Sequence, residues 1–283
     1  MTGLDRADRA DRVRRVYRRE RDRAGGDWRA YVAVARPGGG WDALLEDGAD
    51  RVTPGYSVQK LAVAVAVLDR VDSGSLRLDA LLRLGEEHLL AGAGIYHLQP
   101  VHGDRLTLAN VLAAMLLVSD NTAVRLCGEV VAGPEINEIL AGKGLAHTRV
   151  EPTADPRRFW LGVTTARETV DLLRGLAERT LLAPASCEFV LRVAGAAGGY
   201  CDGVRRDMSS AERARVATKS GADFDQRGAA RHEVGVMRDR AGAPALVYAF
   251  LADALGDVYD YGGTHPAVRA HAALGRALLD AVS

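Results

Sequence analysis

The chain has 283 residues, of which 48% are hydrophobic, and its 37 basic and 37 acidic side chains cancel to a formal net charge of zero. A chain of this length can bury a sizeable core. The balanced charge excludes the strong attraction to nucleic acid or anionic membranes that a basic protein shows, and no apolar run approaches about 18 residues, so no membrane span is expected. We therefore expect a soluble globular protein whose partner is a small molecule.

The N-terminal segment alternates Asp and Arg over its first 23 residues and predicts a charged helix with a solvated outer face, ending at Gly25-Gly26. It lacks the apolar run of a signal peptide, so we expect a cytoplasmic protein as the sequence stands, or a secreted one if a leader has been removed. Residues 28–35 and 41–45 then predict two strands, because apolar and β-branched residues alternate on either side of a turn at Pro37.

The middle of the chain is dominated by helical patterns. From Val58 to about Leu78 apolar residues recur at helical spacing, and residues 61–68 are nearly all apolar, as in a helix buried on most sides. Residues 107–127 continue this pattern with a break at 119–121, and residues 165–176 predict another helix. Strand patterns then return before a closing helix, at residues 213–218, 233–238 and 245–251, followed by residues 264–282.

This order of elements predicts an α+β fold: an antiparallel sheet built from both chain ends, flanked by helices, with a helical subdomain inserted between them. No repeat or linker divides the chain, so we expect one domain over residues 1–283. Its α/β part should cover about residues 1–56 and 205–283, and its helical subdomain about residues 57–204. A cleft is expected where the two parts meet.

Cysteine spacing gives no support for a metal site or a disulfide framework. Cys127, Cys187 and Cys201 are far from the spacing of metal ligands and leave one thiol over if two pair. We expect these cysteines to act as small buried apolar side chains, and we expect the protein to bind no metal and no cofactor. We expect the protein to bind its small-molecule substrate through its own residues alone. We also expect it to be a monomer or a weak dimer.

Lysine is rare in this chain, and two of its three lysines stand in short motifs that can carry chemistry. Only Lys60, Lys143 and Lys219 are lysines among the 37 basic residues, and an amine can lose its proton when desolvated whereas a guanidinium cannot. Ser57-Val58-Gln59-Lys60 places a hydroxyl and an amine on one face of a helix start. The apolar residues that follow would keep the amine neutral, so that it can take the serine proton.

Two further motifs follow. Ser119-Asp120-Asn121 interrupts a deeply apolar stretch and presents a hydroxyl and an amide, although all three residue types are also common helix caps. Lys219-Ser220-Gly221 closes a predicted strand, where the glycine permits close approach of a substrate and the lysine can bind a carboxylate; an ordinary strand end is the alternative. Arg227 is a further candidate to bind a substrate carboxylate.

The three motifs in this order resemble the signature of the class A β-lactamases and the related penicillin-binding proteins. The resemblance implies that Ser57 is the acylated nucleophile, Lys60 a general base and Ser119 a proton shuttle to the leaving amine. It also implies that Asn121 contacts the substrate amide and that Lys219 and Ser220 hold a carboxylate, beside Gly221. The backbone N–H groups of Ser57 and Ala222 would form the oxyanion hole.

The residue that would activate the deacylating water is the point at which this chain departs from the family. The family's Glu-x-x-Leu-Asn segment has no match, and the corresponding stretch around Glu151 is short and lacks Leu-Asn. Glu151 is either the catalytic glutamate or an acid that closes the loop by pairing with Arg149, and Asp155 and Glu168 are the substitutes. General-base assistance is worth about 10²- to 10⁴-fold in rate, so this choice separates fast turnover from a persistent acyl-enzyme.

The sequence thus predicts a serine hydrolase that forms a Ser57 acyl-enzyme and hydrolyses β-lactams, acting on cyclic amide or ester bonds in the context of antibiotic resistance. One alternative is a cytoplasmic esterase, amidase or acyltransferase of secondary metabolism with little β-lactamase turnover. The other is a protein that binds a β-lactam-like ligand without catalysis. The presence of Ser57, Lys60 and Lys219 argues against this alternative.

Overall fold

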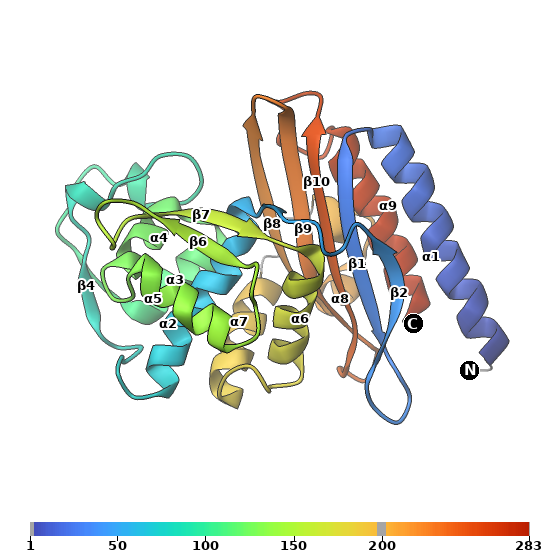
Figure 1. Cartoon of the computed structure of the whole chain (residues 1–283), viewed down its shortest axis with the longest axis horizontal. Coiled ribbons are helices and arrows are strands. Elements are labelled where there is room, and N and C mark those ends of the chain that lie inside the picture. The colour runs from blue at the N-terminus through green and yellow to red at the C-terminus, as the bar shows by residue number, and fades with distance from the viewer. Residues whose placement is uncertain (1–2, 197–201, 283) are drawn as a thin grey trace.

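The computed structural model describes residues 3–196 and 202–282, and its centre is a five-stranded antiparallel sheet in the order β2-β1-β10-β9-β8 (Figure 1). Strand β1 pairs with β10 along its whole length, so the two ends of the chain are joined inside one sheet. This confirms the predicted α+β fold with an antiparallel sheet from both chain ends. The strands of the sheet are β1 (Asp27–Ala35), β2 (Trp41–Asp47), β8 (Val216–Asp225), β9 (Gly228–Arg238) and β10 (Pro244–Leu255).

Two terminal helices, α1 (Gly3–Ala24) and α9 (Pro266–Ala281), cover one face of the sheet and pack against each other (Figure 1). Helix α1 has a buried apolar face in addition to the solvated face that its charged sequence predicts. Val13 and Tyr17 are buried in the core between the helices and the sheet, and the Tyr17 hydroxyl donates to Asp47 at 2.9 Å. A thin apolar stripe is therefore enough to dock this charged helix.

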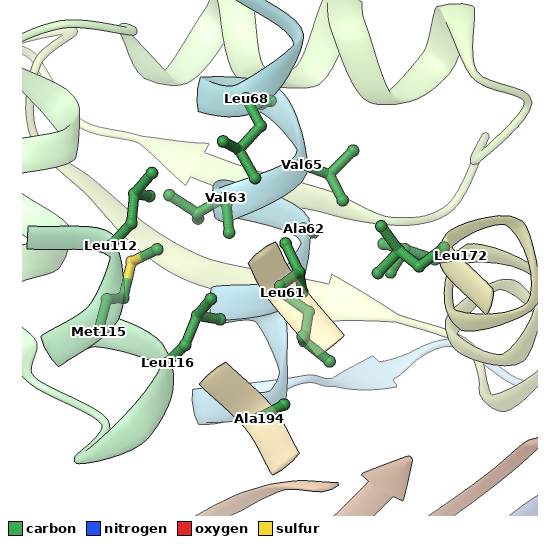
Figure 2. Close-up of a cluster of buried hydrophobic side chains, with 14 of the residues drawn as sticks. Leu61, Ala62, Val63, Val65, Leu68, Leu112, Met115, Leu116, Leu172 and Ala194 are labelled. Atoms are coloured by element: carbon green, nitrogen blue, oxygen red, sulfur yellow. The ribbon is translucent and has the colours of Figure 1, made fainter. Parts of the chain in front are cut away.

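The opposite face of the sheet carries the helical part of the molecule, with α2 (Lys60–Asp72) running through its centre. Every residue from Lys60 to Leu68 is buried, and Figure 2 shows side chains from α3 and α6 surrounding this segment. The continuous apolar run is thus explained by packing on all sides. The other helices here are α3 (Leu108–Leu117), α4 (Asn121–Gly128), α5 (Gly133–Gly142), α6 (Ala166–Ala177) and α7 (Pro184–Gly195).

Short strands and turns complete this part of the chain. Strand β3 pairs with β7, which also forms a hairpin with β6, and β4 pairs with β5. The hairpin lies where the sequence suggested only a short loop around Glu151. The bounds are β3 (Thr53–Pro54), β4 (Leu81–Arg83), β5 (Arg105–Thr107), β6 (Arg149–Pro152) and β7 (Phe159–Thr164), with the one-turn helix α8 (Ser210–Arg213) before β8.

Strand β8 differs from its sequence-based prediction in a way that affects the site. The Lys219-Ser220-Gly221 motif was expected to close a strand, but β8 continues to Asp225 and pairs with β9 throughout. The second half of β8 is mostly exposed and polar, so it lacks the alternation that marks a strand, and its pairing comes from the hairpin with β9. The motif therefore lies in the middle of an edge strand.

Two remaining expectations concern the thiols and the membrane. Cys127 and Cys187 are buried free thiols, as expected, and Cys201 lies outside the described residues. Within the two described ranges, every helix is too short or too polar to cross a bilayer.

Candidate active site

The predicted nucleophile Ser57 lies in a short 3₁₀ helix, η1 (Tyr56–Gln59), that leads directly into α2. The preceding residue, Tyr56, has a left-handed backbone with φ of 46°, a conformation that is uncommon for residues other than glycine. The turn carries the chain from β3 into the helix and leaves Ser57 half-buried on the wall of a cavity. The hydroxyl is thus held at the start of the most deeply buried helix.

The segment that precedes the nucleophile is tied to two strands of the central sheet. The Thr53 hydroxyl donates to the buried carboxylate of Asp253 at 2.9 Å, and Nε2 of His232 lies 3.0 Å from the carbonyl oxygen of Pro54. Because the N–H of Ala252 donates to Nδ1 of His232 at 3.1 Å, the ring proton belongs on Nε2, which donates to Pro54. Strands β9 and β10 therefore fix the approach to Ser57.

The Lys60 amino group is buried among oxygen atoms. Its Nζ lies 3.1 Å from Oγ of Ser119 and 2.7 Å from Oδ1 of Asn121, and it also contacts the Ser119 carbonyl oxygen. Burial lowers the pKa of Lys60 from 10.5 to about 7, although the charge of Asp120 opposes the shift. Near neutral pH a large share of the amine is therefore uncharged and able to accept a proton. Among the described residues, the Lys60 amino group makes no hydrogen bond to the Ser57 hydroxyl, although the Lys60 backbone N–H donates to the Ser57 carbonyl oxygen.

The second lysine approaches the same hydroxyl from the sheet. Nζ of Lys219 lies 3.0 Å from Oγ of Ser119 and 2.8 Å from the carbonyl oxygen of Ser220. Burial and, secondarily, the charge of Lys60 hold the pKa of Lys219 well below its usual range. The Ser119 hydroxyl can accept from one amine while it donates to the lone pair of the other. Lys60, Ser119 and Lys219 thus form a continuous route for protons.

Asp120 and Asn121 hold the wall of the cleft next to this route. The buried carboxylate of Asp120 accepts from the backbone N–H groups of Ile95 at 2.7 Å and Tyr96 at 2.9 Å, and it caps α4. Nδ2 of Asn121 donates to the Ala91 carbonyl oxygen at 3.1 Å. The second motif therefore both positions a lysine and anchors the loop before it, which explains why a capping residue is needed here.

Gly221 brings the edge strand against the nucleophile. A methyl group at Gly221 would lie 3.0 Å from the backbone nitrogen of Val58 and 3.2 Å from that of Ser57, which is closer than real side-chain carbons comfortably pack. The absence of a side chain thus lets β8 approach η1. Ser57 and Ala222, whose N–H groups were predicted to form the oxyanion hole, both line the cavity.

The cavity has a volume of 370 Å³, within the range of about 300–1,000 Å³ that is common for small-ligand sites. Six of the residues predicted for the site line it: Ser57, Ser119, Lys219, Ser220, Gly221 and Ala222. Lys60 and Asn121 join them through the hydrogen bonds to Ser119 and to each other.

Glu151 is not among the residues that line this cavity. It is exposed on β6 of the β6–β7 hairpin, opposite Trp160. Within residues 3–196 and 202–282 its side chain forms neither a hydrogen bond nor an ion pair, so the pairing with Arg149, one of the two alternatives for Glu151, is not made in this structure. The hairpin itself is near the nucleophile helix, because Gln59 donates to the carbonyl oxygen of Arg149 at 3.2 Å and to that of Val163 at 2.7 Å.

The other two acids considered for deacylation have structural partners. Glu168 accepts hydrogen bonds from the Thr148 hydroxyl and from the backbone and ring of His147. Burial would raise the pKa of Glu168, but these donors together outweigh it and lower the pKa. Asp155 pairs with Arg157 on the surface. Glu168 therefore holds the segment of His147 and Thr148 that precedes β6. Neither Glu168 nor Asp155 lines the cavity.

The cavity also reaches residues that the sequence did not assign to chemistry. Glu233 and His232 on β9 and His271 on α9 are part of its lining. His271 stands on the apolar face of α9, between Val268 and Leu274, and an imidazole in that stripe is the signal that could have revealed it. Arg227 is ion-paired with Asp225 and Asp253, not free for a substrate.

Comparison with known proteins identifies the family and the fold of this chain. The model of the β-lactamase enzyme family matches residues 22–282, whereas no curated protein matches the chain significantly. A β-lactamase from Chitinophaga pinensis superposes with a TM-score of 0.81 at 20% identity, covering 96% of this chain and 99% of that one. A β-lactamase from Xanthomonas campestris gives 0.79 at 21% identity, covering 97% and 99%.

A third similar structure is a mutant of PBP-A in an acyl-enzyme complex with penicillin G, with a TM-score of 0.75 and 18% identity over 95% of this chain and 97% of that one. Because these sequence identities are low, the similar structures show the fold alone. The family assignment comes from the family model, which matches nearly the whole chain. The chain therefore belongs to the β-lactamase enzyme family and is a serine hydrolase.

Proposed function

We propose that the protein forms a covalent Ser57 acyl-enzyme with strained cyclic amides and activated esters, and that it releases the acyl group from β-lactams slowly. The observation that carries this proposal is the hydrogen-bonded route from Lys60 through Ser119 to Lys219, beside the cavity that Ser57 lines. Two desolvated amines joined by one hydroxyl supply proton transfer in both directions next to a nucleophile.

Acylation starts with removal of the Ser57 proton. The uncharged form of Lys60, populated because burial lowers its pKa to about 7, accepts this proton as the substrate brings the groups together. Oγ of Ser57 bonds to the substrate carbonyl carbon, and the bond from that carbon to the leaving nitrogen or oxygen breaks. The proton reaches the leaving atom through Ser119, which contacts both lysines.

Backbone N–H groups stabilise the negative charge that develops on the substrate carbonyl oxygen during acylation. Ser57 and Ala222, whose N–H groups would supply these donors, both line the cavity, and the missing side chain of Gly221 permits close packing of η1 and β8. Removing one such donor typically costs about 10²- to 10³-fold in rate. Asn121 and Ser220 then serve to orient the substrate amide and the group beyond it.

Slow release follows from the acids near the site. Among the described residues, the carboxylates that line the cavity belong to Asp202 and Glu233, and neither residue is part of α6 or of the β6–β7 hairpin. Glu151 is exposed, and Glu168 is bound by His147 and Thr148. Without a general base positioned to activate water, the rate of deacylation lacks an acceleration of about 10²- to 10⁴-fold. This favours the esterase or acyltransferase alternative over a fast β-lactamase.

Mass spectrometry of the intact protein tests the proposal. After incubation with penicillin G or p-nitrophenyl acetate, we expect an adduct of the acyl mass that maps to Ser57 and persists for minutes with penicillin G. Ser57→Ala should give no adduct, and Ser73→Ala, at an exposed serine that follows α2, should behave as the unaltered protein. An absent adduct with both reagents, or one that survives in Ser57→Ala, refutes acylation at Ser57. Rapid penicillin turnover without accumulation refutes slow release.

A further inference from the structure

Exposed aromatic side chains gather at the end of the sheet where β8 turns into β9. Among the described residues four aromatic side chains are exposed, and three of them, Phe224, Tyr259 and Tyr261, lie here. Phe224 is on β8 beyond the motif, and the two tyrosines follow β10, whose last residue and Phe224 both pair with Ala229. The fourth, Trp160, is on β7. We call the group of Phe224, Tyr259 and Tyr261 the aromatic rim.

The rim is continuous with the cavity that the nucleophile lines. Tyr261 and Ala222 are both part of the cavity lining. Ala222 and Phe224 are two residues apart on β8, so their side chains are on the same face of the strand and about 7 Å apart along it. The rings of Phe224 and Tyr259 are in edge-to-face contact, with 5.7 Å between their centroids. The rim therefore extends the cavity wall along β8, away from Gly221, at which the strand approaches the nucleophile.

A buried arginine holds the rim in place. The guanidinium of Arg231, which is 2% exposed, donates to the carbonyl oxygen of Asp223 on β8 at 3.0 Å. It also donates to the carbonyl oxygens of Val258 at 3.2 Å and Asp260 at 2.6 Å, in the loop after β10. Its Cζ lies 4.4 Å from the ring centroid of Tyr261 and covers one face of that ring. Because Tyr261 is 51% exposed, its other face is open to a ligand.

The charged groups around the rim favour an uncharged ligand. All five N–H donors of Arg231 are used by backbone carbonyl oxygens, and Arg227 is paired with Asp225 and Asp253. Asp223, next to Phe224, is exposed and forms no ion pair among the described residues. A substrate carboxylate would therefore find an acid and no uncommitted cation here, whereas aromatic faces attract apolar groups.

We propose that the aromatic rim binds a large uncharged apolar group of the substrate, an aromatic ring or a long alkyl chain, and that this group belongs to the acyl part. The acyl side is assigned because Ser119, which returns the proton to the leaving atom, contacts Lys219. The side chain of Lys219 is on the opposite face of β8 from those of Ala222 and Phe224. The leaving group is thus directed to one face and the acyl chain to the other. This inference rests on the proposed acylation of Ser57 and names its substrate class.

Four p-nitrophenyl esters test the proposal, with acetate, octanoate, 4-phenylbutyrate and the monoester of suberate as the acyl part. They share one leaving group, and suberate differs from octanoate by a carboxylate at the end of the chain. After correction for the uncatalysed rates, we expect kcat/KM for 4-phenylbutyrate and octanoate to exceed that for acetate by about tenfold or more. The suberate ester should fall below octanoate. Equal values for all four esters, or a preference for acetate or suberate, overturns the proposal.

Substitutions in the rim connect this preference to the named side chains. Tyr261→Ser and Phe224→Ser should each lower the ratio of kcat/KM for 4-phenylbutyrate to that for acetate by about threefold or more. Tyr261→Phe keeps the ring and should keep the ratio. Trp160→Ser, at the exposed aromatic residue of β7, is the matched control.

Leu117→Ala tests the competing explanation, because Leu117 is an exposed apolar residue that also lines the cavity. Thermal unfolding of each variant checks the fold. If Leu117→Ala lowers the ratio and the two folded serine variants of the rim leave it unaltered, the preference belongs to another wall of the cavity and the proposal is overturned. An unaltered ratio in the rim variants also results if the aromatic rim is a docking surface for another protein, and it overturns the proposal equally.

Binding to Ser57→Ala separates this inference from the proposed function, because it needs no acylation. In protein labelled with 3-fluorotyrosine, fluorine NMR signals of Tyr259 and Tyr261 can be assigned by their replacement with phenylalanine. Titration with 4-phenylbutyramide should shift both signals saturably and leave that of the buried Tyr17 in place, and acetamide should shift neither. If no ester acylates Ser57 but these shifts occur, the proposed function fails and the rim still binds apolar groups. If the esters acylate Ser57 without chain preference or shifts, only the present inference fails.

Discussion

The amino group of Lys60 lies 2.7 Å from the side-chain oxygen of Asn121, so the first and second motifs are joined inside the protein by a buried hydrogen bond. Together with the contacts to Ser119, this bond surrounds the amine with three oxygen atoms. An ammonium can donate to all three, whereas a neutral amine donates to two and keeps a lone pair for the third partner. The protonation state of Lys60 therefore decides the direction of proton flow in the site.

The pH dependence of acylation should report the pKa of Lys60. Because this pKa is lowered to about 7, the competent neutral form increases from pH 6 to pH 8 and is nearly complete above that. The rate of Ser57 acylation, measured by stopped-flow with p-nitrophenyl acetate, should rise over this range and then level off. Lys60→Arg, whose guanidinium stays charged, should lower it by about 10²-fold or more. Lys143→Arg is the matched control, since Lys143 pairs with Asp69 away from the cavity; equal losses in both variants would contradict the assignment.

Stability should depend on pH through the same lysine. In the unfolded chain Lys60 has its ordinary pKa of 10.5, and in the folded protein about 7, so the unfolded state binds more protons between these values. The free energy of unfolding should therefore rise with pH from about 7 to 10, with a contribution from this one group of up to about 1.4 kcal/mol per pH unit. Urea denaturation of Lys60→Met should show a smaller slope, with Lys219 supplying what remains. An unchanged slope would contradict burial of the amine.

Gly221→Ala should damage acylation more than stability. The new methyl group would meet the backbone nitrogens of Ser57 and Val58 at 3.2 and 3.0 Å, so either β8 or η1 must move. A displacement of a few tenths of an ångström to 1 Å at a nucleophile can cost about 10²-fold in rate, and we expect a loss of about 10- to 100-fold in acylation. Gly142→Ala, at a helical glycine with open space around it, is the control. Wild-type rates in Gly221→Ala would show that the close approach is not needed.

Glu151→Gln should leave deacylation nearly unchanged. The side chain is exposed on the β6–β7 hairpin and does not line the cavity. We expect the lifetime of the penicillin G acyl-enzyme, followed by mass spectrometry, to change by less than about twofold, whereas removal of a general base costs about 10²- to 10⁴-fold. A lifetime increased by that larger factor would identify Glu151 as the base and restore the β-lactamase interpretation. Glu178→Gln is a suitable surface control.

Much of the fold follows from local patterns in the sequence. The unbroken apolar run after Lys60 predicts a helix buried on all sides, and the structure has α2 in that position. The three motifs in order predict which polar groups share a cleft, because their residue types carry the chemistry directly. The prediction of α2 succeeds because a single short segment determines that helix and its burial.

Other features depend on contacts between distant segments and leave little trace in the sequence. The left-handed backbones of Tyr56, with φ of 46°, and Ser119, with φ of 57°, are imposed on residues that do not prefer them. The continuation of β8 beyond Gly221 depends on pairing with β9, and the meeting of Glu233 with His271 depends on how α9 packs on the sheet. No window of sequence contains both partners.

The hydrogen bond from Thr53 to Asp253 spans 200 residues of chain. During synthesis at about 5–20 residues per second, a ribosome needs roughly 10–40 s to produce the second partner after the first. Over that interval β1 lacks its neighbour β10, and the approach to Ser57 lacks its anchor. The hydroxyl can therefore be brought into its reactive position only when the last strand of the sheet has left the ribosome, so a prematurely terminated chain that ends before β10 should carry all three motifs and yet no acylating activity.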